Sequence, residues 1–267
     1  MSSLAYTLTD SRTLLRRNLL RLRRYPSMTL MLVGMPIVFM LLFVYVFGGQ
    51  LSHGLSGALA GGHLGRAGYL NYVTPGILLM SVAATVQGTA IVVAMDMTGG
   101  IIDRFRTMAI ARAAVLTGHV LASLIQTLAS IAVVLAVAIA LGFRPTAGPL
   151  GWLGAIGLIA LFAFALIWLA TALGLAAKSV ETASNTPMFL TLLPFLGSGF
   201  VPTGTMPAGL RQFAAYQPFT PVTETLRGLL TGTHVGTHAI VAVASSVGIA
   251  AASYLWARRL YERRQPR

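Results

Sequence analysis

The sequence predicts an all-α polytopic membrane protein with six transmembrane helices. Of the 267 residues, 56% are hydrophobic and only 9% are charged, whereas soluble domains carry about a quarter charged residues. The apolar residues form long continuous runs without strand-like alternation, which favours helices that satisfy their own backbone groups over a β-barrel. The chain has no cysteine, which excludes disulfides, thiolate metal sites and a cysteine nucleophile.

Six apolar runs are candidate spans, since a bilayer core requires about 20 apolar residues of helix. None of them contains an acidic or basic residue, and together they form one transmembrane domain, 27–257: the runs are 27–47, 75–95, 120–141, 152–177, 186–201 and 239–257. The fifth run is short and contains Pro187, Pro194 and a Gly-Ser-Gly triplet at 197–199. We expect a broken or re-entrant segment there.

The distribution of basic residues predicts the orientation of the chain. Fifteen of the 19 lysines and arginines lie on the side that holds both termini and the connector between the second and third runs. By the positive-inside rule, both termini and this connector face the cytoplasm. We assign the net charge of +13 to topology and anionic lipid rather than to nucleic acid. The Arg-, Ala- and Gly-rich composition fits a GC-rich bacterium, so the expected location is the plasma membrane of a bacterium.

The two cytoplasmic ends of the chain are basic. Residues 1–26 place leucines at three-, four- and seven-residue spacing, with arginines mostly on the remaining faces: Leu4, Leu8, Leu15, Leu19 and Leu22. This pattern predicts an amphipathic helix in the membrane surface, where its arginines reach the phosphates of anionic lipids. The same arginines also act as a topology signal. Residues 258–267 form a basic cytoplasmic tail.

The connector GIIDRFRTMAIARAAV, residues 100–115, concentrates four of the few charges of the chain: Asp103, Arg104, Arg106 and Arg112. Read as a helix, it presents four apolar residues on one side: Ile101, Ile102, Phe105 and Met108. Two interpretations follow. The segment is either a cytoplasmic handle for a soluble partner or a topological charge cluster whose apolar residues rest on the membrane. The pattern favours neither.

The segment 200–232, on the outer side, is divided by four prolines: Pro202, Pro207, Pro218 and Pro221. Leu210, Phe213 and Ala214 predict a small amphipathic helix, and residues 222–230 predict a second one. These short outer re-entrant helices after the fifth run would either cap a cavity or anchor the protein at the interface.

The residue pattern argues against catalysis on this chain. Lys178 precedes a serine, but Ala177 stands where a phosphate-binding loop requires glycine, so we exclude a nucleotide site. His234 and His238 have zinc-like spacing without a nearby carboxylate, and we expect no metal site. No carboxylate pair lies within a span, so an ion-coupled relay has no obvious residues. We therefore expect no catalytic residue and no cofactor on the chain.

The connector and the outer segment together resemble the permease subunits of ABC-2 type exporters, in the daunorubicin-resistance branch. In that family the connector reads close to GIIDRFRSLPISRSAVLxGR and the outer segment close to FVPxxxMPxWLRxFAxxQPxTPVxxxLRGLL. Three positions depart from the pattern: Ala109 replaces a proline, His119 an arginine and Gly204 a polar or acidic residue. These departures concern details of coupling and of the outer cap.

The resemblance implies a complex in which this chain has a non-catalytic role. Two permease chains pair, identical or paralogous, and two cytoplasmic ATPase subunits bind them and hold the ATP and Mg. The resemblance makes the connector a coupling helix that docks on the ATPase, formed by Gly100, Ile101, Ile102, Asp103, Arg104, Phe105, Arg106 and Met108. It makes the outer segment a cap over the pathway, formed by Phe200, Pro202, Met206, Pro207, Leu210, Gln217 and Pro218.

Polar residues within the spans are candidates for the pathway lining: Ser81, Thr85, Gln87, Gln126 and Ser198. Hydrogen bonding between helices is the favoured alternative for any one of them. A lining without buried charge suits a hydrophobic or amphipathic cargo such as a lipophilic drug or a lipid. The expected function is therefore the permease subunit of an ATP-driven exporter. The alternatives are a permease for polysaccharide or glycolipid, an ion-gradient-driven carrier or channel, and a membrane enzyme acting on lipid.

Overall fold

The structure, a computed structural model, describes residues 26–49, 65–98 and 112–263, and within these ranges the regular elements are helices, with no strand. Four helices are long and apolar enough to cross a membrane. They are α4 (Arg66–Thr98), α6 (Arg112–Ala140), α7 (Pro149–Ala176) and α12 (His238–Arg263). They correspond to the second, third, fourth and sixth predicted runs.

The first predicted run is also helical but shorter. It forms α2 (Pro26–Leu41), which continues directly into one turn of π-helix, η1 (Leu42–Val46). Its apolar stretch, 32–46, is shorter than the four long helices. The crossing of a membrane by all six runs therefore stays a prediction.

The fifth run is broken, as its prolines and glycines predict. It consists of α8 (Val180–Asn185), α9 (Met188–Leu192) and a series of turns that ends at Phe200. Ser179 begins α8 as its N-cap, because its hydroxyl accepts a hydrogen bond from the Thr182 N–H at 3.2 Å. We call residues 180–200 the broken segment.

The outer segment contains both of the helices that the sequence predicts there. A 3₁₀ turn, η2 (Thr203–Thr205), leads into α10 (Ala208–Tyr216) and then α11 (Phe219–Thr231). α11 ends at Gly232, whose φ of 68° is left-handed, a conformation that favours glycine at a helix end. Unlike α10, α11 has an extensive buried face, which packs against α4, α7 and α12.

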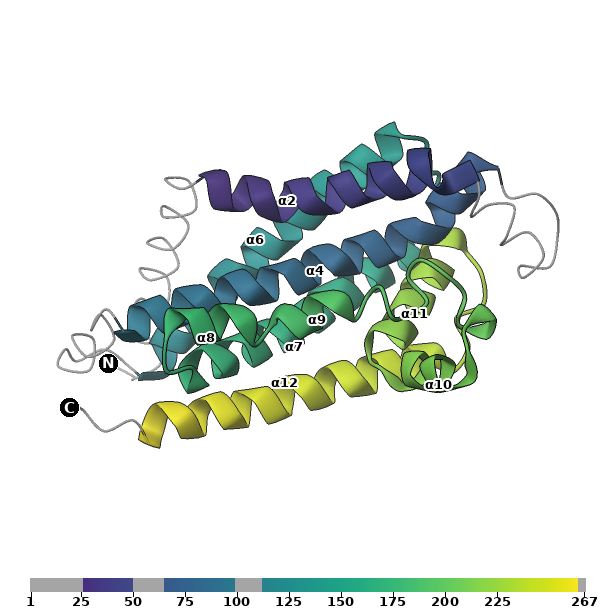
Figure 1. Cartoon of the computed structure of the whole chain (residues 1–267). Helices are drawn as coiled ribbons and strands as arrows, with labels where there is room; N and C mark the ends of the chain where they lie inside the picture. The colour runs from purple at the N-terminus through teal and green to yellow at the C-terminus, as the bar shows by residue number, and fades with distance from the viewer. Residues whose placement is uncertain (1–25, 50–64, 99–111, 264–267) are drawn as a thin grey trace.

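α4 lies at the centre of the bundle. It packs against α2, α6, α7, α8, α9 and α11, and α7 packs in turn against α4 and α12. In Figure 1 the start of α2, the end of α4, the start of α6 and the end of α12 all lie at one end of the bundle. We call this the connector end, and we call the opposite end, where α10 and α11 lie, the far end.

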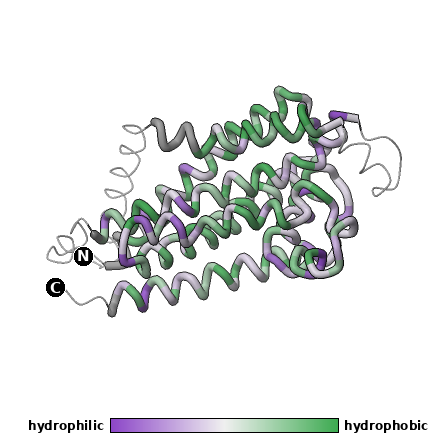
Figure 2. The backbone as a smooth tube through the Cα atoms, viewed as in Figure 1, coloured by the Kyte–Doolittle hydropathy of each residue, from purple (hydrophilic) through white to green (hydrophobic). Residues whose placement is uncertain are grey.

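The outward faces of the helices are apolar. Large apolar side chains are exposed on α7 and α12, with Leu150 82%, Leu153 68% and Ile240 72% exposed. Figure 2 shows that hydrophobic residues extend along most of the helix lengths. Such surfaces require lipid or an apolar partner as their neighbour, and this property identifies a membrane protein.

Three helices extend well beyond their predicted bounds. α4 begins nine residues before the predicted start at 75 and continues to Thr98. α6 begins at Arg112, eight residues before the predicted start at 120, and α12 continues past 257 to Arg263. The 33 residues of α4 span about 50 Å, more than the roughly 30 Å of a bilayer core. Asp96, which immediately follows the second predicted run, is therefore inside the helix, and it is only 3% exposed.

Candidate functional site

The predicted coupling helix, 100–108, lies outside the described residues. The structure does describe the two helices to which it is attached, since α4 ends at Thr98 and α6 begins at Arg112, both at the connector end. The docking role of the connector stays a prediction.

Two of the seven predicted cap residues are buried contacts with the rest of the bundle. The Phe200 ring is stacked on Phe195 at a centroid distance of 4.8 Å and lies 4.6 Å from the Phe43 ring of η1. Gln217, which is 6% exposed, donates a hydrogen bond from Nε2 to the carbonyl oxygen of Leu193 at 3.0 Å. These contacts connect the outer segment to η1 and to the broken segment.

The other five predicted cap residues are more exposed. Pro207 and Pro218 immediately precede α10 and α11, where a fixed proline φ suits the entry into a helix. Leu210 on α10 is 39% exposed, while Pro202 and Met206 are partly buried beside η2. A role for these residues in closing a pathway stays a prediction.

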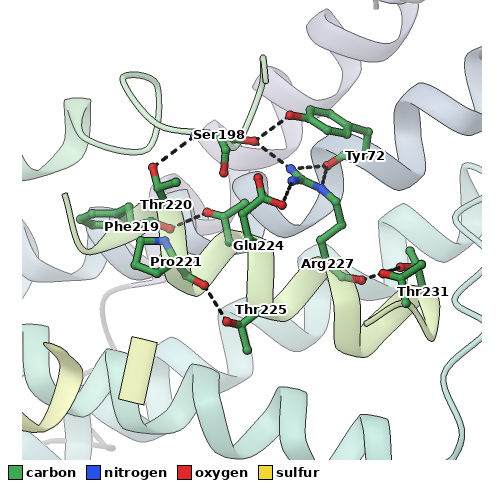
Figure 3. A network of polar contacts seen from close by, with 11 residues as sticks. Tyr72, Ser198, Phe219, Thr220, Pro221, Glu224, Thr225, Arg227 and Thr231 are labelled. Carbon is green, nitrogen blue, oxygen red and sulfur yellow. Dashed lines mark hydrogen bonds and ion pairs between the residues drawn. The ribbon is translucent and has the colours of Figure 1, made fainter. Parts of the chain in front are cut away.

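A polar network at the far end centres on Arg227 of α11 (Figure 3). Its Nη2 donates to the Ser198 carbonyl oxygen at 2.7 Å, and its Nε and Nη2 both donate to the Tyr72 carbonyl oxygen at 3.2 Å. Its Nη1 lies 2.8 Å from Oε2 of Glu224, one turn earlier on the same helix. The guanidinium is therefore held by three segments of the chain. We call Arg227, Glu224, Tyr72, Ser198 and Thr220 the arginine junction.

Tyr72 completes the arginine junction in two ways. Its ring lies under the guanidinium, 3.8 Å from the Arg227 Cζ, and its hydroxyl donates to the Ser198 carbonyl oxygen at 3.1 Å. The Ser198 N–H in turn donates to the Thr220 hydroxyl at 3.4 Å. The planar guanidinium can make such forked and stacked contacts together, which a lysine cannot. The junction fixes the broken segment between α4 and α11.

We expect the substitution Tyr72→Phe to separate the contribution of the Tyr72 hydroxyl from that of its ring. It removes the hydroxyl bond to Ser198 and keeps the ring under Arg227, so the free energy of unfolding should fall by about 1 kcal/mol. Unfolding of the purified protein by SDS in mixed micelles measures this change. A loss of about 3 kcal/mol or more would contradict the assignment, because it would mean that the ring contact also fails.

Sequence reasoning did not find the arginine junction. In the sequence, Arg227 is one of the four basic residues outside the side that holds both termini, and it lies in the LRGLL motif of the resembled family. The contact between Arg227 and Tyr72 joins residues 155 apart in the sequence. The available signal was a glutamate and an arginine spaced three residues apart within an otherwise uncharged helix.

Glycines allow backbone to lie directly against backbone around this site. A Cβ on Gly76 of α4 would lie 2.6 Å from the Gly199 carbonyl oxygen, and one on Gly197 would lie 2.5 Å from Nε2 of Gln217. A Cβ on Gly174 of α7 would lie 2.6 Å from the Ala90 carbonyl oxygen of α4. Glycine is therefore required at the closest approaches of α4 to the broken segment and to α7.

The predicted lining residues of α4 are occupied by bonds within the protein. Ser81 and Thr85 are buried and donate to carbonyl oxygens of their own helix, those of Ile77 at 3.2 Å and of Ser81 at 3.0 Å. Gln87 donates to the Ser184 carbonyl oxygen of α8 at 3.1 Å. The Gln87 bond matches the alternative of hydrogen bonding between helices, whereas Ser81 and Thr85 bond within their own helix.

The remaining two predicted lining residues differ from each other. Gln126 on α6 is partly buried. The Ser198 hydroxyl is buried and has no hydrogen-bond partner among the described residues, although its backbone belongs to the arginine junction. A lining role for all five residues stays a prediction.

In the described part of the chain, no group of three or more histidine and acidic residues is placed to hold a metal ion.

The comparisons with known proteins identify the family. Residues 9–231, more than half of the chain, match the family described as ABC-2 type transporter. The chain belongs to this family. The chain is 29% identical over 222 residues to the daunorubicin resistance ABC transporter permease protein DrrB1 of Streptomyces coeruleorubidus, which covers 83% of this chain and 75% of the relative.

A second relative of this ABC-2 type chain is the probable doxorubicin resistance ABC transporter permease protein DrrC of Mycobacterium tuberculosis, found in two strains. It is 25% identical over 158 residues, which covers 58% of this chain and 57% of the relative. The resemblance to the daunorubicin-resistance branch is thereby confirmed. Together with its long apolar helices, family membership makes the chain a membrane subunit of an ABC transporter.

Proposed function

We propose that the chain is the permease subunit of an ATP-driven exporter that moves a hydrophobic or amphipathic cargo outward across a bacterial plasma membrane. The observation that carries this proposal is membership of the ABC-2 type transporter family. The relatives support it, because their names assign them to resistance against daunorubicin and doxorubicin.

The composition of the bundle interior supports an apolar cargo. In the described part of the chain, Asp96 and His119 are the buried acidic and basic side chains, and they contact each other. The nearly buried Arg227 is paired with Glu224. Charged side chains inside spans commonly mark the pathway of a hydrophilic ion, and these charges are instead paired with each other. Saturable transport of a small hydrophilic anion by the reconstituted complex would contradict this part of the proposal.

The energy would come from a separate ATPase that docks on the coupling helix, 100–108, at the start of the connector. Its apolar side would fill a groove on the ATPase, while Asp103, Arg104 and Arg106 would pair with polar groups at the rim. The two ATPase subunits of the complex would hold ATP and Mg. The exposed apolar faces of the helices would provide the contact surface for a second permease chain. The basic segment 1–26 would bind anionic lipids.

Co-purification from detergent with ATPase subunits encoded nearby tests the proposal. The variant carrying both Arg104→Glu and Arg106→Glu should retain on the order of a hundredfold less ATPase than the wild type, since like-charge contacts in an interface cost several kcal/mol. The matched control is Arg263→Glu with Arg264→Glu, the same charge change in the C-terminal tail, which should leave retention unchanged.

The possible outcomes separate the parts of the proposal. A wild-type chain that retains no ATPase under any nucleotide condition would contradict the proposal that an ATPase drives transport. Equal loss of ATPase in the control would mean that charge reversal in either segment weakens ATPase retention, and that the connector has no special role in docking. Transport by the reconstituted chain alone, driven by an ion gradient, would favour the carrier alternative.

A further inference from the structure

A buried polar pair joins α4 to α6 close to the connector. Nε2 of His119 lies 3.1 Å from Oδ2 of Asp96, a hydrogen-bonding distance, and the two side chains are only 6% and 4% exposed. Asp96 lies two residues before the end of α4 at Thr98, and His119 lies in the second turn of α6. The pair therefore sits at the connector end of both helices.

A second contact continues the same line between the helices. The Thr89 hydroxyl of α4 and the Ser123 hydroxyl of α6 are 3.0 Å apart. Thr89 lies seven residues before Asp96, and Ser123 four residues after His119, so each helix uses one face for both contacts. We call these four residues the α4–α6 clamp.

The position of the clamp determines what it can control. The thirteen residues 99–111, which include most of the connector, start where α4 ends and finish where α6 begins. The separation and direction of its two ends therefore depend on how α4 and α6 pack at this end. Bonds between buried polar groups are direction-dependent, and a group that loses its partner in a low-dielectric interior is costly, so the clamp specifies one arrangement of the two helices.

The clamp is not what keeps α4 in the bundle. α4 also packs against α2, α7 and α11, and its closest approach to α7, at Gly174 and Ala90, involves neither Asp96 nor Thr89. Loss of the clamp should consequently change the relation between α4 and α6 more than it changes the fold as a whole.

We infer that the α4–α6 clamp positions the ATPase-docking connector, and that Asp96 and His119 are positioning residues through which movement of the ATPase reaches α4. This inference rests on the proposed function. The clamp holds the two ends of the connector at a fixed separation, so that a displacement of the docked connector moves α4 and α6 together. Without the clamp, the same displacement separates the two helices instead of moving the bundle.

The test uses the complex of the chain with its ATPase subunits in liposomes, with daunorubicin as the cargo probe. The variants are Asp96→Asn, which removes the carboxylate, His119→Leu, which removes both ring nitrogens, and the reciprocal exchange Asp96→His with His119→Asp, which preserves the pair. The measured quantity is daunorubicin moved per ATP hydrolysed. The matched control is Ser246→Ala, because Ser246 is buried but bonds only the Ala242 carbonyl oxygen of its own helix, α12.

We expect each single variant to lower the daunorubicin moved per ATP by about tenfold, within the usual range of coupling between two sites. The reciprocal exchange should recover most of this loss, and Ser246→Ala should leave the ratio unchanged. A purely structural role would lower transport and ATP hydrolysis in parallel and would leave the ratio intact, which would overturn the inference.

A second measurement does not need the ATPase. Because the chain has no cysteine, spin labels can be attached to Met95→Cys on α4 and Leu121→Cys on α6, both 40% exposed. In the full chain in lipid nanodiscs, Asp96→Asn should broaden the distance distribution between the labels, and the reciprocal exchange should narrow it again. An unchanged distribution would overturn the inference.

The outcomes also separate this inference from the proposed function. A wild-type complex that retains no ATPase would remove the proposed function, and the transmission role with it. A wild-type complex that transports daunorubicin, with variants that transport equally well per ATP, would remove the clamp alone.

Discussion

The substitution Arg227→Met is expected to lower the free energy of unfolding by about 3 kcal/mol, near the lower bound for removing one partner of a buried pair. It would remove three hydrogen bonds to the carbonyl oxygens of Tyr72 and Ser198 and leave the Glu224 carboxylate without its partner. Glu224 is about a third exposed, which moderates the loss. Unfolding by SDS in mixed micelles, followed by tryptophan fluorescence, measures the change.

Two further variants make the Arg227 measurement specific. Arg227→Lys keeps the charge but cannot reproduce the forked contacts, so it should fall between the wild type and Arg227→Met. Arg144→Met changes an exposed arginine that bonds the carbonyl oxygens of Ile139 and Phe143, and should cost about 0.5 kcal/mol. If Arg227→Met and Arg144→Met lowered the free energy of unfolding equally, the arginine junction would stabilise the protein no more than the contacts of an exposed arginine.

The substitution Gly76→Ala should be the most damaging of the conservative changes in α4. The new Cβ would lie within 2.8 Å of three Gly199 backbone atoms, which cannot rotate away as a side chain could. We expect a loss of about 1–3 kcal/mol, typical of overpacking, or a displaced broken segment. The thermal midpoint of the purified protein, measured in detergent, provides the test.

The same helix supplies the control for Gly76. Gly88 has no atom within 4 Å of the position of a Cβ, so Gly88→Ala meets no obstacle. Alanine is the better helix former by about 1 kcal/mol, so this variant should be neutral or more stable than the wild type. If Gly88→Ala and Gly76→Ala lowered the midpoint equally, the backbone contact between α4 and the broken segment would not be the cause.

The helices themselves were predictable where apolar composition decides them. Continuous apolar runs predict α7 close to its observed position and α12 close to its observed start, and Pro187, Pro194 and the glycines at 197–199 mark the broken segment. The start of α4 was not predictable in this way. The apolar run begins at Pro75, yet Pro75 lies inside the helix, because polar and aromatic residues before it are buried by neighbouring segments.

The contacts of the candidate site were less accessible to sequence reasoning. The resemblance pointed to Phe200 and Gln217, which the structure places in buried contacts. In the sequence, Asp96 is simply the residue after the second predicted run, and His119 is a departure from the pattern of the resembled family. Their pairing depends on the packing of α4 against α6, and no local pattern in either helix encodes that packing.

The close approach of α7 to α4 gives α4 the geometry of a lever. The contact at Ala90 and Gly174 leaves about 12 Å of α4 between this fulcrum and Thr98, and about 21 Å between it and Gly76. A tilt of α4 about the fulcrum would therefore carry Gly76 in the opposite direction to Thr98 and almost twice as far. Because Gly76 is in backbone contact with Gly199, this larger displacement would be transmitted directly to the broken segment.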